Sequence, residues 1–149
     1  MEDPPTAVQL GVTPTRMLVR GLFHRCPVCG GAGVICRWFS IVERCPTCDL
    51  KIERIEGHMI GYIGLNTIVC FTFTFLTLLV GAVVMVPDIQ PVPLVIAALV
   101  PAALGPILFF PSSRTMWTAI DLIMRPLVPG EVDPRYVLKD PARDHPTGG

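Results

Sequence analysis

The sequence predicts a mainly α-helical membrane protein, in which a small four-cysteine domain precedes two hydrophobic membrane spans. Three observations favour this fold class. Two uncharged hydrophobic runs, 59–87 and 89–113, are each longer than the ~20 apolar residues needed to cross a bilayer. Two Cys-x-x-Cys pairs precede these runs. Every Lys and Arg lies outside the runs, as expected for segments that sit in lipid.

The composition also favours a membrane protein over a soluble domain. Hydrophobic residues make up 51% of the 149-residue chain and charged residues 16%, whereas soluble domains carry about 25% charged residues. The formal net charge is zero, so total charge gives no argument for nucleic-acid binding. The alternative is a buried helical hairpin in a soluble protein, but too little chain remains to cover two such helices.

The two spans are expected at about 59–86 and 93–110. Between them, Asp88 lies in a segment flanked by Pro87 and Pro91, which favours a sharp turn. Pro101 and Pro106 fall inside the second span, where each should kink the helix. The first hydrophobic run starts near residue 59, so it is not an N-terminal signal peptide.

The charge distribution predicts the orientation. Lys and Arg occur on both flanks of the hydrophobic region, and the connecting loop carries only Asp88. The positive-inside rule then places both termini in the cytoplasm, in a multi-pass protein of a bacterial inner membrane.

Four cysteines have the spacing of a structural zinc site. The pairs are separated by fifteen residues, and each pair can supply two thiolates to one tetrahedral ion. Zn²⁺ with a structural role is the expected cofactor, and iron held by the same thiolates remains an alternative. A cytoplasmic location disfavours disulfides. The predicted ligands are Cys26, Cys29, Cys45 and Cys48.

The residues around these cysteines predict two tight turns joined by a strand pair. Gly30 and Asp49 follow the two pairs, where a left-handed backbone is expected. The β-branched and aromatic segment 34–42 favours two short strands. Cys36 lies in this segment, and Cys70 lies in the first span; for both we expect a small buried hydrophobic side chain.

The flanking segments are predicted by their composition. Residues 1–15 are expected to be a disordered lead, and 16–57 a basic stretch followed by the zinc-ribbon module. The basic and apolar residues of 16–25 fit either an anionic leaflet or a strand or turn that packs on the cysteine domain. Residues 112–126 predict a separate interfacial amphipathic helix. Residues 127–149 predict a flexible tail.

Polar and small residues gather on one side of the first span. Asn66, Cys70 and Thr74 recur at helical spacing, and Gly57 and Gly61 permit close approach of another helix. Contact with the second span or with a partner protein is the expected role. A metal, cofactor or proton site that uses His58, Asn66 and Cys70 is the alternative, although we expect His58 to be an interfacial residue.

The chain resembles a family of small bacterial membrane proteins, the "domain of unknown function 983" family. The resemblance covers roughly 16–128. It is carried by Arg-Gly-Leu-Phe-His-Arg-Cys-Pro-Val-Cys-Gly at 20–30, by Cys-Pro-Thr-Cys at 45–48, and by the two spans that follow. It implies a role without enzymatic activity, in the biogenesis of respiratory complexes such as cytochrome c oxidase. The start of the first span, 56–61, departs from the Gly-Asp-Gly-type start of many members.

No paired carboxylates, Ser/His/Asp set or phosphate-binding glycine loop are recognisable, so we do not expect an enzyme. The leading hypothesis is a non-enzymatic membrane accessory or assembly protein that packs against a larger membrane complex. One alternative is a metal- or cofactor-handling membrane protein that uses Cys70 and His58. Another is a zinc-ribbon docking module with a membrane anchor. No small-molecule substrate is indicated, and nucleic acid is disfavoured because acidic residues offset the arginines of the cysteine domain.

Overall fold

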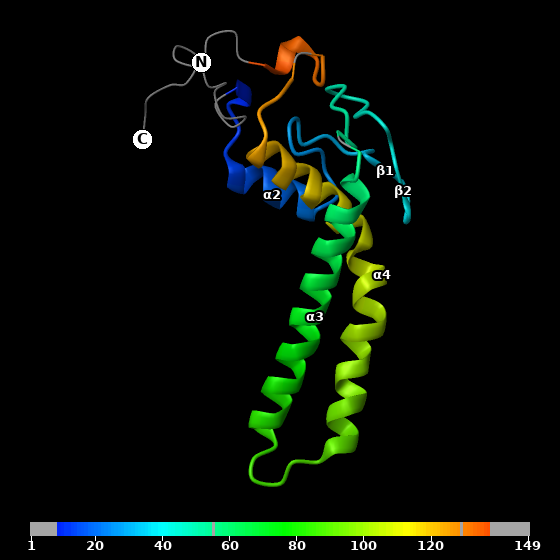
Figure 1. Cartoon of the computed structure of the whole chain (residues 1–149), viewed down its shortest axis with the longest axis vertical. Helices are drawn as coiled ribbons and strands as arrows, with labels where there is room; N and C mark the ends of the chain where they lie inside the picture. Colours follow the sequence, from blue (N-terminus) through cyan, green and yellow to red (C-terminus); the bar gives the residue numbers. More distant parts are fainter. Residues whose placement is uncertain (1–8, 55, 129, 138–149) are drawn as a thin grey trace.

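The computed structural model describes residues 9–54, 56–128 and 130–137. Two long helices run side by side as a hairpin, and a small domain sits at one end of it (Figure 1). In chain order the elements are α2 (Pro14–Leu22), β1 (Ile35–Arg37), β2 (Ser40–Ile41), α3 (His58–Val84), α4 (Pro91–Met124) and the 3₁₀ helix η1 (Pro134–Tyr136).

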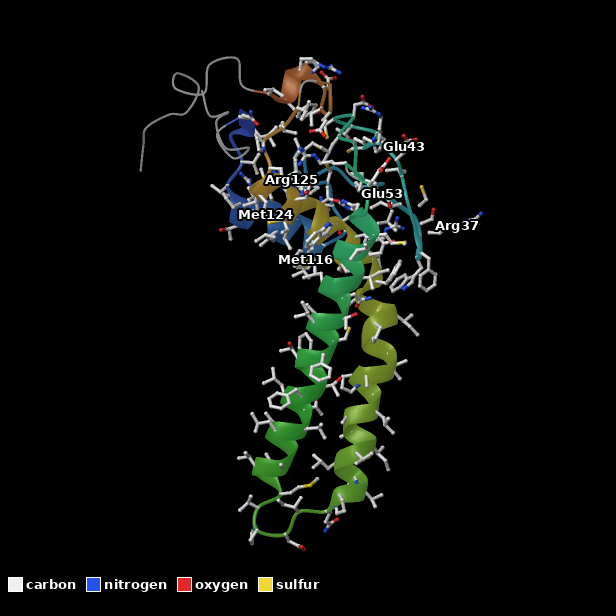
Figure 2. All side chains as sticks on the ribbon, viewed as in Figure 1. Arg37, Glu43, Glu53, Met116, Met124 and Arg125 are labelled. Atoms are coloured by element: carbon white, nitrogen blue, oxygen red, sulfur yellow. The ribbon has the colours of Figure 1, made fainter. Side chains whose placement is uncertain are left out.

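The hairpin consists of two long apolar helices, as predicted. Both α3 and α4 are long and apolar enough to cross a membrane. Only 6% of the most hydrophobic 18-residue stretch of each helix is buried. Mostly hydrocarbon side chains project outward along the hairpin (Figure 2). The turn at Met85–Gln90 lies at the end opposite the small domain (Figure 1).

Threonine hydroxyls on α3 are hydrogen-bonded within the helix. Four threonines donate to the carbonyl four residues earlier, at 2.8–2.9 Å. An unpaired hydroxyl would be costly in a hydrocarbon environment, and this local bond removes that cost without a partner. The four are Thr67, Thr72, Thr74 and Thr77.

The expected separate helix at 112–126 is instead the last part of α4. The helix continues through Pro101, Pro106 and Pro111 without a break. A proline removes one helical donor and leaves the carbonyl four residues earlier free. For Pro111 that carbonyl belongs to Ile107, and the indole N–H of Trp38 donates to it at 2.7 Å. The cysteine domain thus supplies the donor that Pro111 lacks.

Residues 112–122 of α4 are mostly buried, against our expectation of an interfacial helix. This part of α4 bends away from the hairpin and runs beside α2 (Figure 1). The crossing is close at Gly21, because a Cβ there would lie 2.9 Å from the Thr115 carbonyl oxygen. Residues 16–25 therefore form mainly a helix packed on α4, rather than the strand or turn considered above.

The core of the small domain draws on segments from most of the chain. It joins residues of the cysteine segment, α2, the end of α4 and the C-terminal segment: Leu10, Met17, Cys26, Val28, Val34, Cys45, Cys48, Leu50, Ile52, Ala119, Leu122 and Val132. Leu10 belongs to the predicted disordered lead yet is buried, and residues 1–8 of that lead lie outside the described residues.

The first part of the predicted flexible tail is also packed on the cysteine domain. Val132 is buried, the Lys51 N–H donates to the Glu131 carbonyl at 3.0 Å, and the Asp133 N–H donates to the Cys48 carbonyl at 2.9 Å. These contacts join residues more than seventy positions apart, so local composition gave no sign of them. Residues 138–149 lie outside the described part of the chain.

Candidate metal centre

The four predicted cysteines form one cluster that could hold a metal ion. Their sulfur atoms all lie within 4.8 Å of one another. The Cys26 and Cys48 sulfurs are 3.5 Å apart, and those of Cys29 and Cys45 are 3.7 Å apart. A tetrahedral site with metal–sulfur bonds of ~2.3 Å has sulfurs about 3.8 Å apart. The donor type, the number of donors and their spacing therefore fit a tetrathiolate metal ion.

The two Cys-x-x-Cys turns have the same backbone hydrogen bonds. The Gly30 N–H donates to the Cys26 carbonyl at 2.9 Å, and the Asp49 N–H donates to the Cys45 carbonyl at the same distance. The residues after the pairs adopt φ values of 74° at Gly30 and 57° at Asp49. The predicted left-handed backbone at these two positions is confirmed. The short strand pair between the turns, β1 and β2, is confirmed as well.

An arginine precedes each turn and bonds across it. Arg25 donates to the Gly30 carbonyl at 3.4 Å, and Arg44 donates to the Asp49 carbonyl at 3.2 Å. Arg20 of α2 adds a bond of 2.6 Å to the Val28 carbonyl. The sequence carried a signal for this arrangement, since Arg-Cys-Pro-x-Cys occurs in both turns.

The thiols differ in acidity. The hydrogen bond between Cys26 and Cys48 lowers the pKa of Cys48 to about 6 and raises the pKa of Cys26 above its ordinary value. Burial raises the pKa of Cys29 to about 11. A metal ion binds thiolates, so binding would release protons from thiols that are protonated in its absence.

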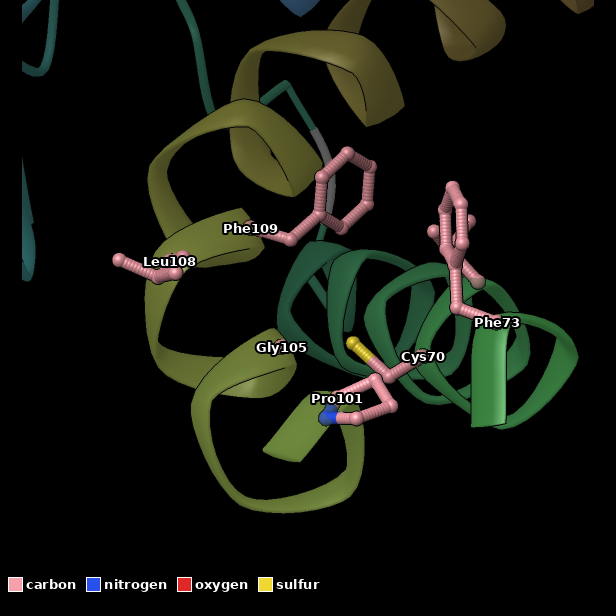
Figure 3. Close-up of a pocket in the computed structure, with 7 residues that line it drawn as sticks. Cys70, Phe73, Pro101, Gly105, Leu108 and Phe109 are labelled. Carbon is pink, nitrogen blue, oxygen red and sulfur yellow. The ribbon is translucent and has the colours of Figure 1, made fainter. Parts of the chain in front are cut away.

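The other two cysteines lie outside the cluster. Cys36 is exposed on β1, so the prediction that it is buried was wrong. A two-stranded sheet buries only one face, and Val34 is the residue of this segment that enters the core. Cys70 is buried as predicted; its side chain faces Pro101 and Gly105 of α4 (Figure 3).

The polar residues of α3 contact the second long helix. The Asn66 side-chain amide donates to the Pro106 carbonyl at 3.0 Å, and the Cys70 thiol donates to Asn66 Oδ1 at 3.3 Å. Thr74 bonds to the Cys70 carbonyl of its own helix. Of the two roles expected for this stripe, contact with the second span is therefore present within the chain.

The two glycines at the start of α3 have different environments. The indole of Trp117 packs on Gly61 so closely that a Cβ there would lie 1.9 Å from a ring carbon. A Cβ added at Gly57 would meet no atom of the described residues within 4 Å, so this glycine makes no close helix approach. Its φ of 88° at the start of α3 accounts for a glycine at this position.

A buried ion-pair cluster at the junction of the domain and the hairpin was not predicted. Arg54 pairs with Asp121 at 3.0 Å and with Glu131 at 2.7 Å, and the side chains of Arg54 and Asp121 are only 4% and 2% exposed. Burial would raise the pKa of Glu131, but hydrogen bonds from Arg54 and from the Val128 N–H outweigh it and lower the pKa. One sign of this cluster was present in the sequence: Asp121 is a single carboxylate in the otherwise uncharged helical segment 115–124.

His58 and Arg114 lie beside this cluster. His58 was expected at the membrane interface, yet it is buried against α4, with Nε2 3.5 Å from Thr118 Oγ1. Its Nδ1 has no partner among the described residues. Arg114 pairs with Glu53 at 2.6 Å and lies 5.0 Å from the centre of the Tyr62 ring. Several side chains thus fix the domain to the start of α3.

Comparison with family models, curated proteins and solved structures found no match. The resemblance to the "domain of unknown function 983" family therefore stays a prediction.

Proposed function

We propose that this protein is a non-enzymatic membrane accessory protein, in which a structural zinc ion holds a small cytoplasmic domain rigidly on a two-helix anchor. The carrying observation is the cluster of four cysteine sulfurs within 4.8 Å. Four protein thiolates complete a tetrahedral zinc site and leave no position for a substrate, so such a site supports folding.

The junction supports a rigid attachment of the domain. Trp38 bonds to α4, Arg114 of α4 bonds to Glu53, and Arg54 bonds to Asp121 of α4. A flexible tether would require none of these contacts. A rigid domain presents a fixed surface at a defined distance from the bilayer, which suits a protein that positions or assembles other membrane subunits. The family resemblance makes a respiratory oxidase the first complex to test as a partner.

Metal or cofactor handling through Cys70 and His58 is a weaker proposal. Cys70 is bonded to Asn66 inside the hairpin, and His58 lies at the domain end of α3, three helical turns away. No contact joins the two side chains among the described residues. The same rigid junction also argues against a freely tethered docking module.

Metal analysis of the purified protein tests the proposed centre. We expect close to one zinc per chain in mild detergent, lost in Cys26→Ser and retained in the controls Cys36→Ser and Cys70→Ala. Iron in place of zinc would contradict the assignment of the metal. Metal lost from Cys70→Ala would instead support the handling alternative.

Cross-linking in native membranes tests the accessory role. A photoreactive amino acid at an exposed hairpin position, such as Phe71, should give an adduct with a membrane subunit. The same group at exposed Arg135, in η1, is the control for nonspecific capture. A protein that stays monomeric and forms no adduct from any exposed hairpin position would contradict the proposal.

A further inference from the structure

Helix α2 has an apolar outer face that no described residue covers. Met17 and Gly21 face the core and are buried. Val19 and Leu22, on the other side of the helix, are exposed, and Phe23, which directly follows the helix, is 67% exposed. Exposed apolar side chains that gather on one face mark a site of contact with a membrane or a partner.

The contacts of α2 place this outer face at the level of the membrane boundary. Ser112 donates to the Leu22 carbonyl at 3.0 Å, and Thr115 donates to the Gly21 carbonyl. The uncharged run of α4 ends at Ser113, and Arg114 follows it. The C-terminal end of α2 is therefore at the depth where α4 leaves its uncharged run, and α2 lies on the hairpin side of the domain (Figure 1).

A second exposed aromatic group is anchored at a similar depth. Trp38 bonds to the Ile107 carbonyl, and the Phe39 ring lies 5.3 Å from that of Phe110. Phe39 is nevertheless 62% exposed. Aromatic side chains are favoured at the boundary between lipid tails and headgroups. Two separate segments of the domain thus bring exposed apolar groups to the same boundary.

Three exposed arginines accompany these apolar groups. Arg16 is on α2, Arg25 follows its C-terminal end, and Arg37 precedes Trp38. None of the three forms an ion pair with a described residue, in contrast to Arg54 and Arg114. Guanidinium groups next to apolar side chains at a membrane boundary are suited to bind lipid phosphates.

We propose that the domain rests on the anionic leaflet from which the hairpin emerges. The outer face of α2 and the β1–β2 turn enter the headgroup region, and Arg16, Arg25 and Arg37 bind the phosphates of anionic lipids. The inference rests on the proposed membrane anchor. A protein partner on the same face is the competing occupant, but charge and continuity with the bilayer around the spans favour lipid.

Fluorescence quenching by brominated lipids tests this placement in the full-length protein. Phe23→Trp is made in a Trp38→Phe/Trp117→Phe background and reconstituted in nanodiscs of phosphatidylcholine with or without phosphatidylglycerol. Lipids brominated near the carbonyl end of the acyl chain should quench Trp at position 23, and more strongly with phosphatidylglycerol. The same tryptophan placed by Arg135→Trp, in η1, should not be quenched.

Charge reversal supplies a second test that leaves both native tryptophans in place. Arg16→Glu/Arg25→Glu/Arg37→Glu should lower the amount of phosphatidylglycerol that copurifies with the protein. Each arginine near a lipid surface contributes roughly fivefold in affinity. The matched control is Arg135→Glu, which should retain the copurifying lipid.

The outcomes separate this inference from the proposed function. No quenching at position 23 in a protein that enters nanodiscs and keeps its metal would overturn lipid contact and leave the anchor intact. Equal quenching with and without phosphatidylglycerol, or unchanged copurification in the triple variant, would overturn anionic recognition. Failure to enter nanodiscs at all would instead contradict the membrane anchor.

Discussion

The hairpin and the small domain are stabilised by different kinds of contact: mostly local ones in the hairpin and mostly long-range ones in the domain. Along the hairpin, polar groups are satisfied locally, by threonines bonded within α3 and by one side-chain amide that reaches α4. In the domain, the core joins residues from Leu10 to Val132. The buried ion pair between Arg54 and Glu131 likewise joins residues 77 positions apart.

This difference shows how each region depends on its surroundings. The hairpin is suited to an apolar solvent, because its helices are long and apolar and only 6% of the most hydrophobic 18-residue stretch of each is buried within the chain. The domain is too small to be held by core burial alone, so it should depend on the metal and on its junction with α4. Perturbing either support should therefore affect the two regions unequally.

Removal of the metal should give the largest difference in stability between the two regions. In Cys48→Ser we expect the domain to unfold while α3 and the first part of α4 stay helical in detergent. A structural zinc ion contributes about 10–16 kcal/mol to the folding of small zinc domains. Metal content, together with hydrogen exchange of the two regions, measures the effect. Cys36→Ser, in an exposed cysteine outside the cluster, is the control, and equal loss of protection in both regions would refute the separation.

Loss of one partner of the buried ion pair should have the next largest effect. Arg54→Met leaves the Asp121 carboxylate buried without its closest cation and removes the arginine partner of Glu131, which costs about 3–5 kcal/mol. The thermal melting temperature of the metal-bound protein should fall. The triple variant Arg54→Met/Asp121→Leu/Glu131→Gln should recover much of the loss, since no ionised side chain of this cluster then remains. Arg135→Ala, in an exposed pair, should leave the melting temperature unchanged; a similar drop there would contradict the role of burial.

The sequence predicted the parts of the molecule that depend on local pattern. Hydrophobic length predicted α3 and most of α4, and the spacing of Cys26, Cys29, Cys45 and Cys48 predicted the cluster. The repeated turn chemistry predicted the left-handed backbone at Asp49. Each of these features follows from a pattern along the chain, namely the length of a hydrophobic run, the spacing of the cysteines or the residues of one turn.

The features that sequence reasoning missed depend on distant contacts. Pro111 looked like a helix end because its donor is missing, but Trp38 supplies a donor from 73 positions away. Glu131 looked like part of a tail because its partner, Arg54, is 77 positions away. His58 looked interfacial because nothing nearby in sequence shows that α4 covers it. No composition or periodicity rule reports such pairings.

A smaller effect should come from filling the space at Gly61. A methyl group there would overlap the Trp117 indole, so Gly61→Ala should displace that ring and cost about 1–3 kcal/mol. Gly64→Ala is the matched control on the same helix, because no atom of the part of the chain that the structure describes lies within 4 Å of the added carbon. The melting temperatures of the two variants, in the same detergent, measure the difference. Equal values would show that the domain does not depend on close packing at the start of α3.

The smallest expected effect concerns the hydrogen bond from Trp38 to the Ile107 carbonyl, which Pro111 leaves without a donor from the helix. Trp38→Phe keeps an aromatic ring but removes the donor to the Ile107 carbonyl, which should cost about 1–2 kcal/mol. Pro111→Ala restores a backbone N–H at the position from which a helix normally donates to Ile107. In that background the cost of Trp38→Phe should shrink, because the carbonyl already has a partner. A double-mutant cycle of melting temperatures measures the coupling. Additive effects would mean that Trp38 stabilises the junction by packing alone, and the continuity of α4 through Pro111 would then be a property of the hairpin rather than of the domain.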